Sequence, residues 1–314
     1  MIFDQNSTTD EVLAGIRLDG RTALVTGANT GLGTETARAL AAAGARVIMT
    51  ARNAERGAAA LAQVRAQVPG AEVELVDLDL TSLASVRACA QAVLARHDRL
   101  HLLINNAGVM ATPFERTRDG FELQMGTNHL GHFLLAGLLA PALLRAAPAR
   151  VVAVSSLGHY WSDIRWDDPN WERTPYDKWQ AYGQSKTANI LFAVELDRRL
   201  WERGVNAFSL HPGAIHTELG RYMTPEDLAN VAKMAEQGAT QWKTVPQGAA
   251  SSVWAATAPG LVTQGGAYIQ DCQVQRVGDF NSRVGHAPWA RDLQSAARLW
   301  ELSERMVGQA FPLD

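Results

Sequence analysis

The chain is 314 residues long, and its 29 lysines and arginines stand against 32 aspartates and glutamates, giving a formal net charge of −3. Apolar residues make up 47% of the chain and charged residues 19%, which is typical of a globular protein and excludes a disordered one. The near-neutral charge offers no basic face to nucleic acid, so we expect no such partner. The two cysteines, Cys89 and Cys272, lie far apart, which excludes a disulfide scaffold and a cysteine-rich zinc site and fits a reducing compartment.

The N-terminal segment and the longest apolar run both argue against a membrane segment. Residues 1–12 have no basic start and no apolar core, unlike a signal peptide. The apolar run at 133–144 is too short to cross a bilayer and contains Pro141. We therefore expect a cytoplasmic protein with no transmembrane segment, in which an N-terminal extension at 1–19 precedes one domain at 20–314.

Short β-branched runs alternate along the chain with Ala-rich amphipathic stretches. The runs predict strands at 22–26, 45–50, 72–77, 100–105, 150–155, 205–210 and 266–270. The stretches predict helices at 32–43, 54–67, 82–95, 121–146, 181–203 and 247–257. Apolar runs bounded by turn residues are typical of strands buried on both faces. The predicted fold is therefore α/β, with a doubly wound, mostly parallel sheet of seven strands that binds its ligand at the carboxyl ends of the strands.

Two long connections interrupt this alternation. Residues 157–180 hold four of the nine tryptophans, and residues 218–246 follow a Pro-Gly turn and have a partly helical pattern. Long connections in a compact fold are usually lids or binding loops, so we interpret both as substrate loops.

The first predicted strand leads directly into a glycine-rich turn at 27–33, where a helical pattern starts. Glycines allow the backbone to approach a pyrophosphate closely, and the helix N-terminus supplies free N–H groups. Such a turn alone can be purely structural, but its position between a strand and a helix at the head of an α/β chain favours nucleotide binding.

Further motifs follow this turn in a fixed order. They are GxxxGxG at 27–33, Asn105-Asn106-Ala107-Gly108, Asn128, Ser155-Ser156, Tyr182-x-x-x-Lys186 and Pro212-Gly213-x-x-x-Thr217. Over about residues 20–270, the chain resembles the short-chain dehydrogenase/reductase superfamily. The sequence that begins at Tyr182 (YGQSKTANILF) and the widened gap before it make the chain most similar to the branch of retinol dehydrogenases and WW-domain oxidoreductases. The resemblance implies a single-domain Rossmann fold and an oxidoreductase that acts on a carbonyl/alcohol pair.

The same resemblance assigns four catalytic residues. Tyr182 would be the acid/base at the substrate oxygen, Lys186 would hold the nicotinamide ribose, Ser156 would orient the carbonyl, and Asn128 would bind a water in a proton relay. Tyr182 and Lys186 are four residues apart and share one helix face, where an ammonium, together with the positive nicotinamide ring of the oxidised cofactor, would lower the pKa of the phenol. A Tyr/Lys pair alone is common on surface helices. Ser156 precedes Tyr182 by 26 positions, about twice the usual separation in the family, and Ser155 is interpreted as a buried, satisfied neighbour.

The end of the second predicted strand bears on the choice of cofactor. NAD enzymes usually place an acid there, whereas this chain has Ala51 and Arg52. An arginine can pair with a 2′-phosphate, so NADP(H) is favoured over NAD(H), although Arg52 could also be a solvated surface charge. For the adenine, Asp79 is preferred to Asp77. The cofactor contacts implied by the resemblance are Gly27, Asn29, Thr30, Gly31, Leu32, Gly33, Arg52, Asp79, Leu80, Asn106, Ala107, Gly108, Tyr182, Lys186, Pro212, Gly213, Ile215 and Thr217.

The remaining predictions concern metal, substrate and rival functions. His129 and His132 have no evident third ligand, so we expect no metal site. Apolar residues in the two substrate loops favour a small hydrophobic carbonyl or alcohol substrate. They are Tyr160, Trp161, Leu219, Tyr222, Met223, Met234 and Trp242, and Gly220 and Gly238 would let the second loop move. The rivals are a catalytically silent NADP-binding scaffold and a sugar-nucleotide epimerase or dehydratase, which usually shows GxxGxxG and a separate C-terminal domain. A homo-oligomer stays open.

Overall fold

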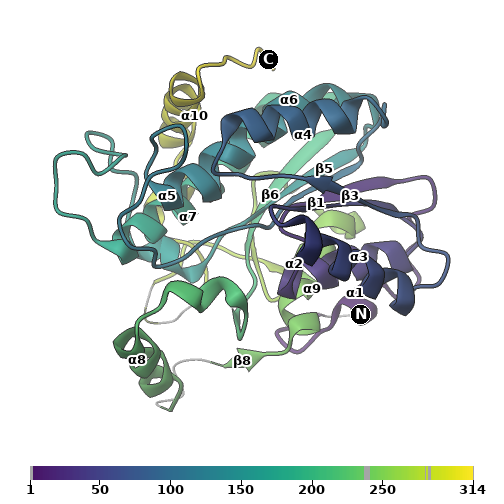
Figure 1. Ribbon diagram of the computed structural model, residues 1–314, viewed down its shortest axis with the longest axis horizontal. Coiled ribbons are helices and arrows are strands. Elements are labelled where there is room, and N and C mark those ends of the chain that lie inside the picture. Colours follow the sequence, from purple (N-terminus) through teal and green to yellow (C-terminus); the bar gives the residue numbers. More distant parts are fainter. Residues whose placement is uncertain (1–2, 237–240, 280, 282–283, 314) are drawn as a thin grey trace.

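Figure 1 shows a computed structural model of the chain, which describes residues 3–236, 241–279, 281 and 284–313. One sheet has the strand order β10-β9-β6-β5-β4-β1-β2-β3, and all neighbours are parallel except β10 and β9. Its strands are β1 (Thr22–Val25), β2 (Arg46–Ala51), β3 (Val73–Asp77), β4 (Leu102–Asn105), β5 (Ala149–Val154), β6 (Val205–His211), β9 (Tyr268–Gln270) and β10 (Gln273–Val274). The predicted doubly wound, mostly parallel sheet is confirmed, and β10 adds a short antiparallel edge.

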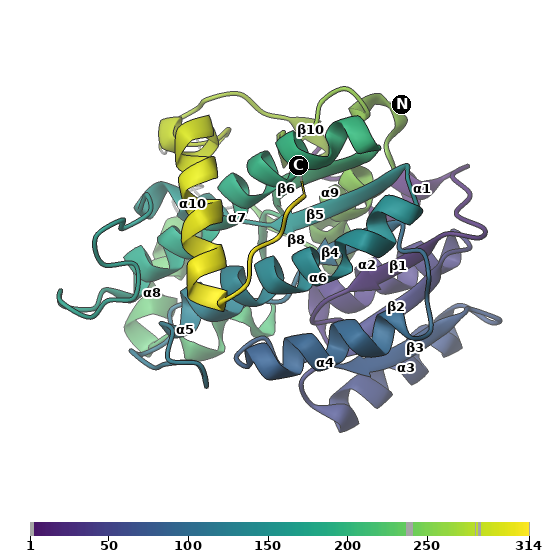
Figure 2. The same ribbon diagram turned by 90° about the horizontal axis from the view of Figure 1, so that it is seen from above.

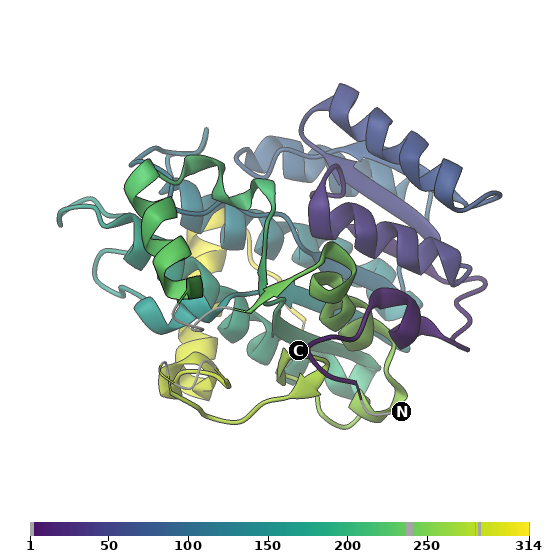
Figure 3. The same ribbon diagram turned by 90° about the horizontal axis from the view of Figure 1, so that it is seen from below.

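Helices cover both faces of the sheet (Figures 2 and 3). One layer holds α1 (Thr9–Leu13), α2 (Gly31–Ala42), α3 (Ala54–Gln67) and α9 (Val245–Thr257). The other holds α4 (Leu83–Leu94), α6 (Gly131–Arg145), α7 (Lys178–Leu200) and α10 (Leu293–Val307). Along β1, Leu24 packs into the second layer while Ala23 and Val25 pack into the first. This alternation of side chains across a strand explains why the predicted strands are apolar throughout.

The predicted helix at 121–146 is the largest departure from the sequence pattern. It divides into α5 (Leu123–Met125), a π-helical turn (Gly126–Leu130) and α6. The whole stretch Leu123–Arg145 is long and apolar enough to cross a membrane by length and composition, but 83% of its most apolar window is buried inside the protein. Burial of this extent is what a core helix requires.

The C-terminal helix α10 was not predicted, although it has clear local signals. Asp292 caps its start by accepting a hydrogen bond from the Ser295 N–H, and Gly308 ends it with a φ of 66°. The helix buries Leu299 and Trp300 at the spacing expected of an amphipathic helix. It packs across α7, the helix that carries Tyr182 and Lys186 (Figure 2).

The strand order reverses direction at β1, which lies between β4 and β2. Ligands of doubly wound sheets bind at such a reversal, at the carboxyl ends of the strands. The two long connections extend from this edge. The first begins with a 3₁₀ turn (Leu157–Trp161). The second contains a 3₁₀ turn (Glu218–Tyr222) and α8 (Pro225–Glu236), and its last residues form β8 (Trp242–Lys243), which pairs with β7 (Ala214–Ile215).

Candidate active site

The glycine-rich turn after β1 has three positions that only glycine suits. Gly27 has a φ of +63°, and a Cβ on it would lie 2.9 Å from the Ala107 Cβ. Gly31 also has a positive φ of +51°. A Cβ on Gly33 would come within 2.3 Å of the Gly27 carbonyl oxygen. The turn is therefore pressed against the loop that follows β4, and larger residues would push the two apart.

Helix α2 begins at Gly31, at the edge of a cavity of about 1430 Å³. In the described part of the chain, no side chain caps this helix, because the Thr30 side chain makes no cap hydrogen bond. The first N–H groups of an uncapped helix attract anions, as does the positive end of its dipole. This end of the cavity therefore fits the pyrophosphate of a dinucleotide.

The cavity brings together all the residues predicted to contact the cofactor. It follows the carboxyl edge of the sheet, from Arg52 and Asp79 after β2 and β3 to Ser156 after β5. Asp79 lines the cavity, and Asp77 is not among the lining residues. The predicted contacts on its wall are Gly27, Asn29, Thr30, Gly31, Leu32, Gly33, Arg52, Asp79, Leu80, Asn106, Ala107, Gly108, Tyr182, Lys186, Pro212, Gly213, Ile215 and Thr217.

Tyr182 and Lys186 lie one turn apart on α7, both on the cavity wall and both buried. The Lys186 Nζ lies 5.5 Å from the centre of the Tyr182 ring and donates a hydrogen bond to the Val154 carbonyl at 3.1 Å. Burial raises the pKa of Tyr182 to about 12, and a hydrogen bond with Ser156 opposes this rise. Burial lowers the pKa of Lys186 to about 8. The lowering of the Tyr182 pKa that was predicted for the ammonium together with the oxidised nicotinamide ring concerns the protein with its cofactor bound, and it stays a prediction.

Ser156 keeps its place beside Tyr182 despite the long insertion between them. Its Oγ accepts a hydrogen bond from the Gly158 N–H at 3.0 Å, which starts the 3₁₀ turn at once. A Cβ on Gly158 would lie 2.8 Å from the Tyr182 ring, and one on Gly183 would lie 2.8 Å from the Ser162 nitrogen. These two glycines let the turn pack directly on α7, so the extra residues extend outward. Neither glycine was predicted from the sequence to shape the site.

Ser155 and Asn128 support the site from behind. The buried Ser155 donates to the Lys186 carbonyl at 2.7 Å, as expected of a satisfied neighbour. Asn128 lies in the π-helical turn, is fully buried, and is not among the residues that line the cavity. Its Nδ2 donates to the Val109 carbonyl and to the Ser185 Oγ, both at 2.9 Å, while its Oδ1 accepts from the Val109 N–H at 2.8 Å. These bonds tie the π-helical turn to the segment after β4 and to α7, and the predicted part of Asn128 in a water relay stays a prediction.

The two histidines considered as metal ligands have partners within the core. The His129 Nε2 lies 2.7 Å from the Ser303 Oγ on α10. The His132 Nε2 lies 2.8 Å from the Thr26 Oγ1, immediately before the glycine-rich turn. Burial lowers the pKa of His129 to about 3 and that of His132 to about 4, so both rings are neutral at pH 7.

Comparison with known proteins identifies the family. A model of the family described as short chain dehydrogenase matches residues 21–227. The chain belongs to this family. It is 41% identical over 302 residues to retinol dehydrogenase 11 of Mus musculus, covering 96% of this chain and 90% of that one. It is 40% identical over 293 residues to retinol dehydrogenase 12 of Homo sapiens, covering 93% and 88%. These relatives place it in the retinol dehydrogenase branch, as an oxidoreductase that acts on CH–OH groups.

Solved structures agree with this assignment. A crystal structure of a putative uncharacterized protein from Mycobacterium paratuberculosis has a TM-score of 0.75 and 36% identity, with 98% of this chain and 99% of that one covered. A Pseudomonas aeruginosa RhlG/NADP active-site complex has a TM-score of 0.65 and 29% identity, with 81% and 95% covered. A nicotinamide cofactor therefore suits this short-chain dehydrogenase.

Apolar residues of both long connections line the dehydrogenase cavity. Trp161 packs on Trp179 with ring centres 5.2 Å apart and lies 6.1 Å from the Tyr182 ring. From the other connection come Leu219, Tyr222, Met223, Leu228 and Trp242. Tyr160 was predicted here but packs instead against His159 and Tyr268, away from the cavity lining. Gly238 and the side chain of Met234 lie outside the described residues.

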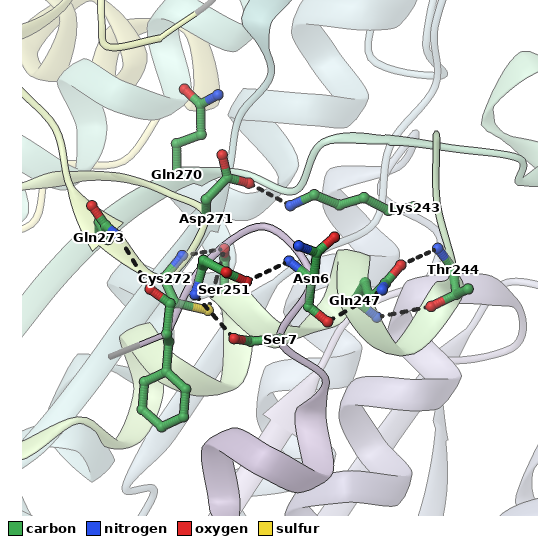
Figure 4. A network of polar contacts seen from close by, with 12 residues as sticks. Asn6, Ser7, Lys243, Thr244, Gln247, Ser251, Gln270, Asp271, Cys272 and Gln273 are labelled. Atoms are coloured by element: carbon green, nitrogen blue, oxygen red, sulfur yellow. Dashed lines mark hydrogen bonds and ion pairs between the residues drawn. The ribbon is translucent and has the colours of Figure 1, made fainter. Parts of the chain in front are cut away.

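A network of polar contacts holds the base of the second connection (Figure 4). Lys243 on β8 forms an ion pair with Asp271. Its aliphatic chain packs so closely on Gly213 that a Cβ on this glycine would lie only 2.7 Å from the Lys243 Cδ. From the following helix, the Gln247 Nε2 donates to the Asn6 carbonyl at 3.2 Å. Gln5, in the predicted N-terminal extension, also lines the cavity. None of these contacts was predicted from the sequence, because each joins segments that are distant along the chain, from 28 residues for Lys243 and Asp271 to 241 for Gln247 and Asn6.

Proposed function

We propose that this short-chain dehydrogenase transfers hydride between NADP(H) and the carbonyl/alcohol pair of a bulky hydrophobic substrate. One observation carries the proposal. A single cavity joins an uncapped helix N-terminus and Arg52 to Ser156, Tyr182 and Lys186, and then to an apolar wall. The first part suits a phosphate-bearing cofactor, the second suits proton exchange at an oxygen, and the third suits an apolar substrate.

The side chains divide the chemistry between them. When bound, NADPH would supply the hydride to the carbonyl carbon. Ser156 would donate a hydrogen bond to the carbonyl oxygen, and Tyr182 would give its proton to that oxygen. The high pKa of Tyr182, about 12, keeps it protonated for this step at neutral pH. Lys186, with a pKa of about 8, would exchange protons near neutral pH and hold the ribose from one turn away. Asn128 would act behind them as a positioning residue.

The preference for NADP(H) over NAD(H) rests on the end of β2. Ala51 ends this strand, so no acid stands at the strand end, and the Arg52 that follows lines the cavity. A guanidinium would form charge-assisted hydrogen bonds with a 2′-phosphate, whereas an acid would repel it. The related RhlG structure is a complex with NADP, which supports the same choice here.

The substrate proposal rests on the apolar end of the cavity. Trp161, Trp179, Tyr222 and Met223 lie on its wall, and an unpaired anion among them would lose several kcal/mol of hydration. The names of the curated relatives point to retinol, which is a bulky apolar alcohol of the proposed class. We infer a long-chain or ring-bearing alcohol, aldehyde or ketone rather than a charged metabolite.

An assay of carbonyl and alcohol substrates with both cofactors tests the proposal. Oxidation of NADPH would be followed with bulky apolar aldehydes and ketones, including retinal, and with small charged keto acids. We expect kcat/KM to be higher for the bulky apolar aldehydes and ketones than for the charged keto acids. For the apolar substrates, we expect kcat/KM to be higher with NADPH than with NADH. A chain that binds NADPH but turns over no member of the panel would instead be the silent scaffold.

We further propose a cytoplasmic location. The buried, unpaired thiols of Cys89 and Cys272 suit a reducing compartment. The apolar stretch Leu123–Arg145 is largely buried inside the fold. Fractionation of cells that express the full-length protein tests this, because recovery in the membrane pellet would contradict it. A second copy of the chain stays a candidate partner, and sedimentation would show whether it forms.

A further inference from the structure

Thr26, the residue before the glycine-rich turn, has a hydroxyl that contacts two elements. Its Oγ1 accepts hydrogen bonds from the Asn106 N–H at 2.9 Å and from the Ala107 N–H at 3.0 Å. The same Oγ1 lies 2.8 Å from the His132 Nε2 and 3.4 Å from the Ile104 carbonyl. Two N–H donors occupy both lone pairs of a hydroxyl, so its one proton is free only to be donated. The shorter contact assigns that proton to His132.

This donation fixes the tautomer of His132. Because Nε2 accepts, the ring proton lies on Nδ1, which donates to the Asn128 carbonyl at 2.9 Å. The ring is 2% exposed, and its burial next to Lys186 keeps it neutral. His132 therefore joins the end of β1 to the π-helical turn through two directed hydrogen bonds.

Asn128 continues the connection to α7. Its Nδ2 donates to the Ser185 Oγ at 2.9 Å, and Ser185 donates to the Tyr182 carbonyl at 2.8 Å. All the residues on this path are buried, with exposed fractions of 7% or less. We call the path from Thr26 through His132, Asn128 and Ser185 to Tyr182 the hydrogen-bond series. It links the turn that faces the cofactor to the helix that holds the acid/base.

We propose that His132 is a positioning residue that sets the distance between the cofactor wall and Tyr182. The inference rests on the proposed function, since it assigns His132 a role in that reaction. Without His132, the Thr26 hydroxyl has only the 3.4 Å contact to Ile104 for its proton. If the Thr26 hydroxyl rotated toward the Ile104 carbonyl, its lone pairs would turn away from the N–H groups of Asn106 and Ala107. These two residues line the cofactor site, so its wall would move with them. A displacement of about 1 Å from a remote change can lower turnover by about 100-fold.

The test compares two buried histidines on the same stretch of chain. His132→Phe removes the two hydrogen bonds that His132 makes in the hydrogen-bond series, whereas His129→Phe removes a bond to Ser303 on α10 and is the matched control. Both variants should lose stability. Only His132→Phe should weaken NADPH binding, by about tenfold in a fluorescence titration, and lower kcat by about 10- to 100-fold. KM for the carbonyl substrate should stay near the wild-type value, since the hydrogen-bond series holds no residue of the apolar wall.

A second variant keeps the test decisive if His132→Phe does not fold. Ser185→Ala cuts the hydrogen-bond series at α7 and should lower kcat in the same way. If the residues act as one path, the double variant should lose little more than the larger single loss. Unchanged NADPH binding and kcat in His132→Phe, or losses that multiply in the double variant, would overturn the inference. Failure of the wild type to turn over any substrate would instead count against the proposed function, and NADPH binding would still report on the hydrogen-bond series.

Discussion

The carboxylate of Asp227 on α8 lies 2.5 Å from the ammonium of Lys178, the first residue of α7. The same carboxylate accepts hydrogen bonds from the Thr224 N–H at 2.7 Å and from its hydroxyl at 2.9 Å. This ion pair ties the second substrate connection to the helix that holds Tyr182, one turn from the acid/base. The Lys178 contact and the Thr224 donors lower the pKa of Asp227 against the opposing effect of desolvation.

Breaking this ion pair should weaken substrate binding without affecting the cofactor. Asp227→Asn keeps an acceptor for Thr224 but loses the charge that Lys178 meets. The pair is partly exposed on the Lys178 side, so its loss should cost about 1 kcal/mol and raise KM for an apolar aldehyde about fivefold. Lys178→Gln should do the same, and the double variant should add nothing further. Steady-state kinetics check this, and an equal rise in the Kd of NADPH would show that the contact does not act on the substrate end.

Tyr182 should be indispensable for turnover and dispensable for cofactor binding. Tyr182→Phe removes the hydroxyl that would protonate the substrate oxygen and keeps the packing against Trp161. We expect kcat to fall by about 100-fold or more, with the Kd of NADPH near the wild-type value. Tyr160→Phe is the control, because this second tyrosine packs on His159 outside the cavity lining. Comparable turnover in the two variants would refute the acid/base role.

Arg52 should discriminate between the two nicotinamide cofactors. A charge-assisted hydrogen bond to the 2′-phosphate contributes roughly 1.5–3 kcal/mol, so Arg52→Ala should weaken NADPH binding about tenfold or more. NADH binding should change little, since NADH lacks that phosphate. Arg46→Ala is a matched control at the opposite end of β2, where Arg46 pairs with Glu72 on the surface. Titrations with both cofactors decide the matter, and an equal loss for both would show that Arg52 does not contact the phosphate.

Local patterns made much of the fold and of the cofactor wall predictable. Each of the seven predicted strands forms within two residues of its predicted ends, because buried apolar runs between turn residues leave little choice of structure. The wall around Gly27–Gly33 could be predicted because a tight turn against Ala107 requires glycine at fixed spacing. Predictions of this kind depend on neighbours along the chain.

Features that depend on contacts between distant residues could not be predicted. The π-helical turn contains Asn128, whose carbonyl accepts a hydrogen bond from His132 and whose side chain bonds to Val109. The spacing of these residues along the sequence does not predict either partner. The place of Gln5 on the cavity wall depends on bonds from α9 and β10 to the N-terminal segment. The burial that raises the pKa of Tyr182 also depends on the fold around it, which the spacing of Tyr182 and Lys186 does not reveal.

Buried histidines should make the protein lose stability in mild acid. Burial lowers the pKa of His129 to about 3 and that of His132 and His159 to about 4, against an ordinary value of 6.5. Below about pH 6.5, the unfolded chain therefore binds protons that the folded chain does not, and the free energy of unfolding falls as the pH falls. Each such histidine contributes up to about 1.4 kcal/mol per pH unit in the window between its two pKa values.

Urea denaturation at pH 7.5, 6 and 5 measures this loss above the range in which ordinary carboxyl groups titrate. Buried carboxyls such as Glu122, whose pKa is raised by desolvation, act in the opposite direction, so a comparison must isolate one histidine. His129→Phe isolates one histidine, because it removes the imidazole that takes up a proton in the unfolded chain and leaves every carboxyl group in place. We expect the free energy of unfolding of this variant to start lower at pH 7.5 and to fall less steeply toward pH 5 than that of the wild type. Parallel slopes for the two proteins would mean that His129 is protonated in the folded state as readily as in the unfolded one.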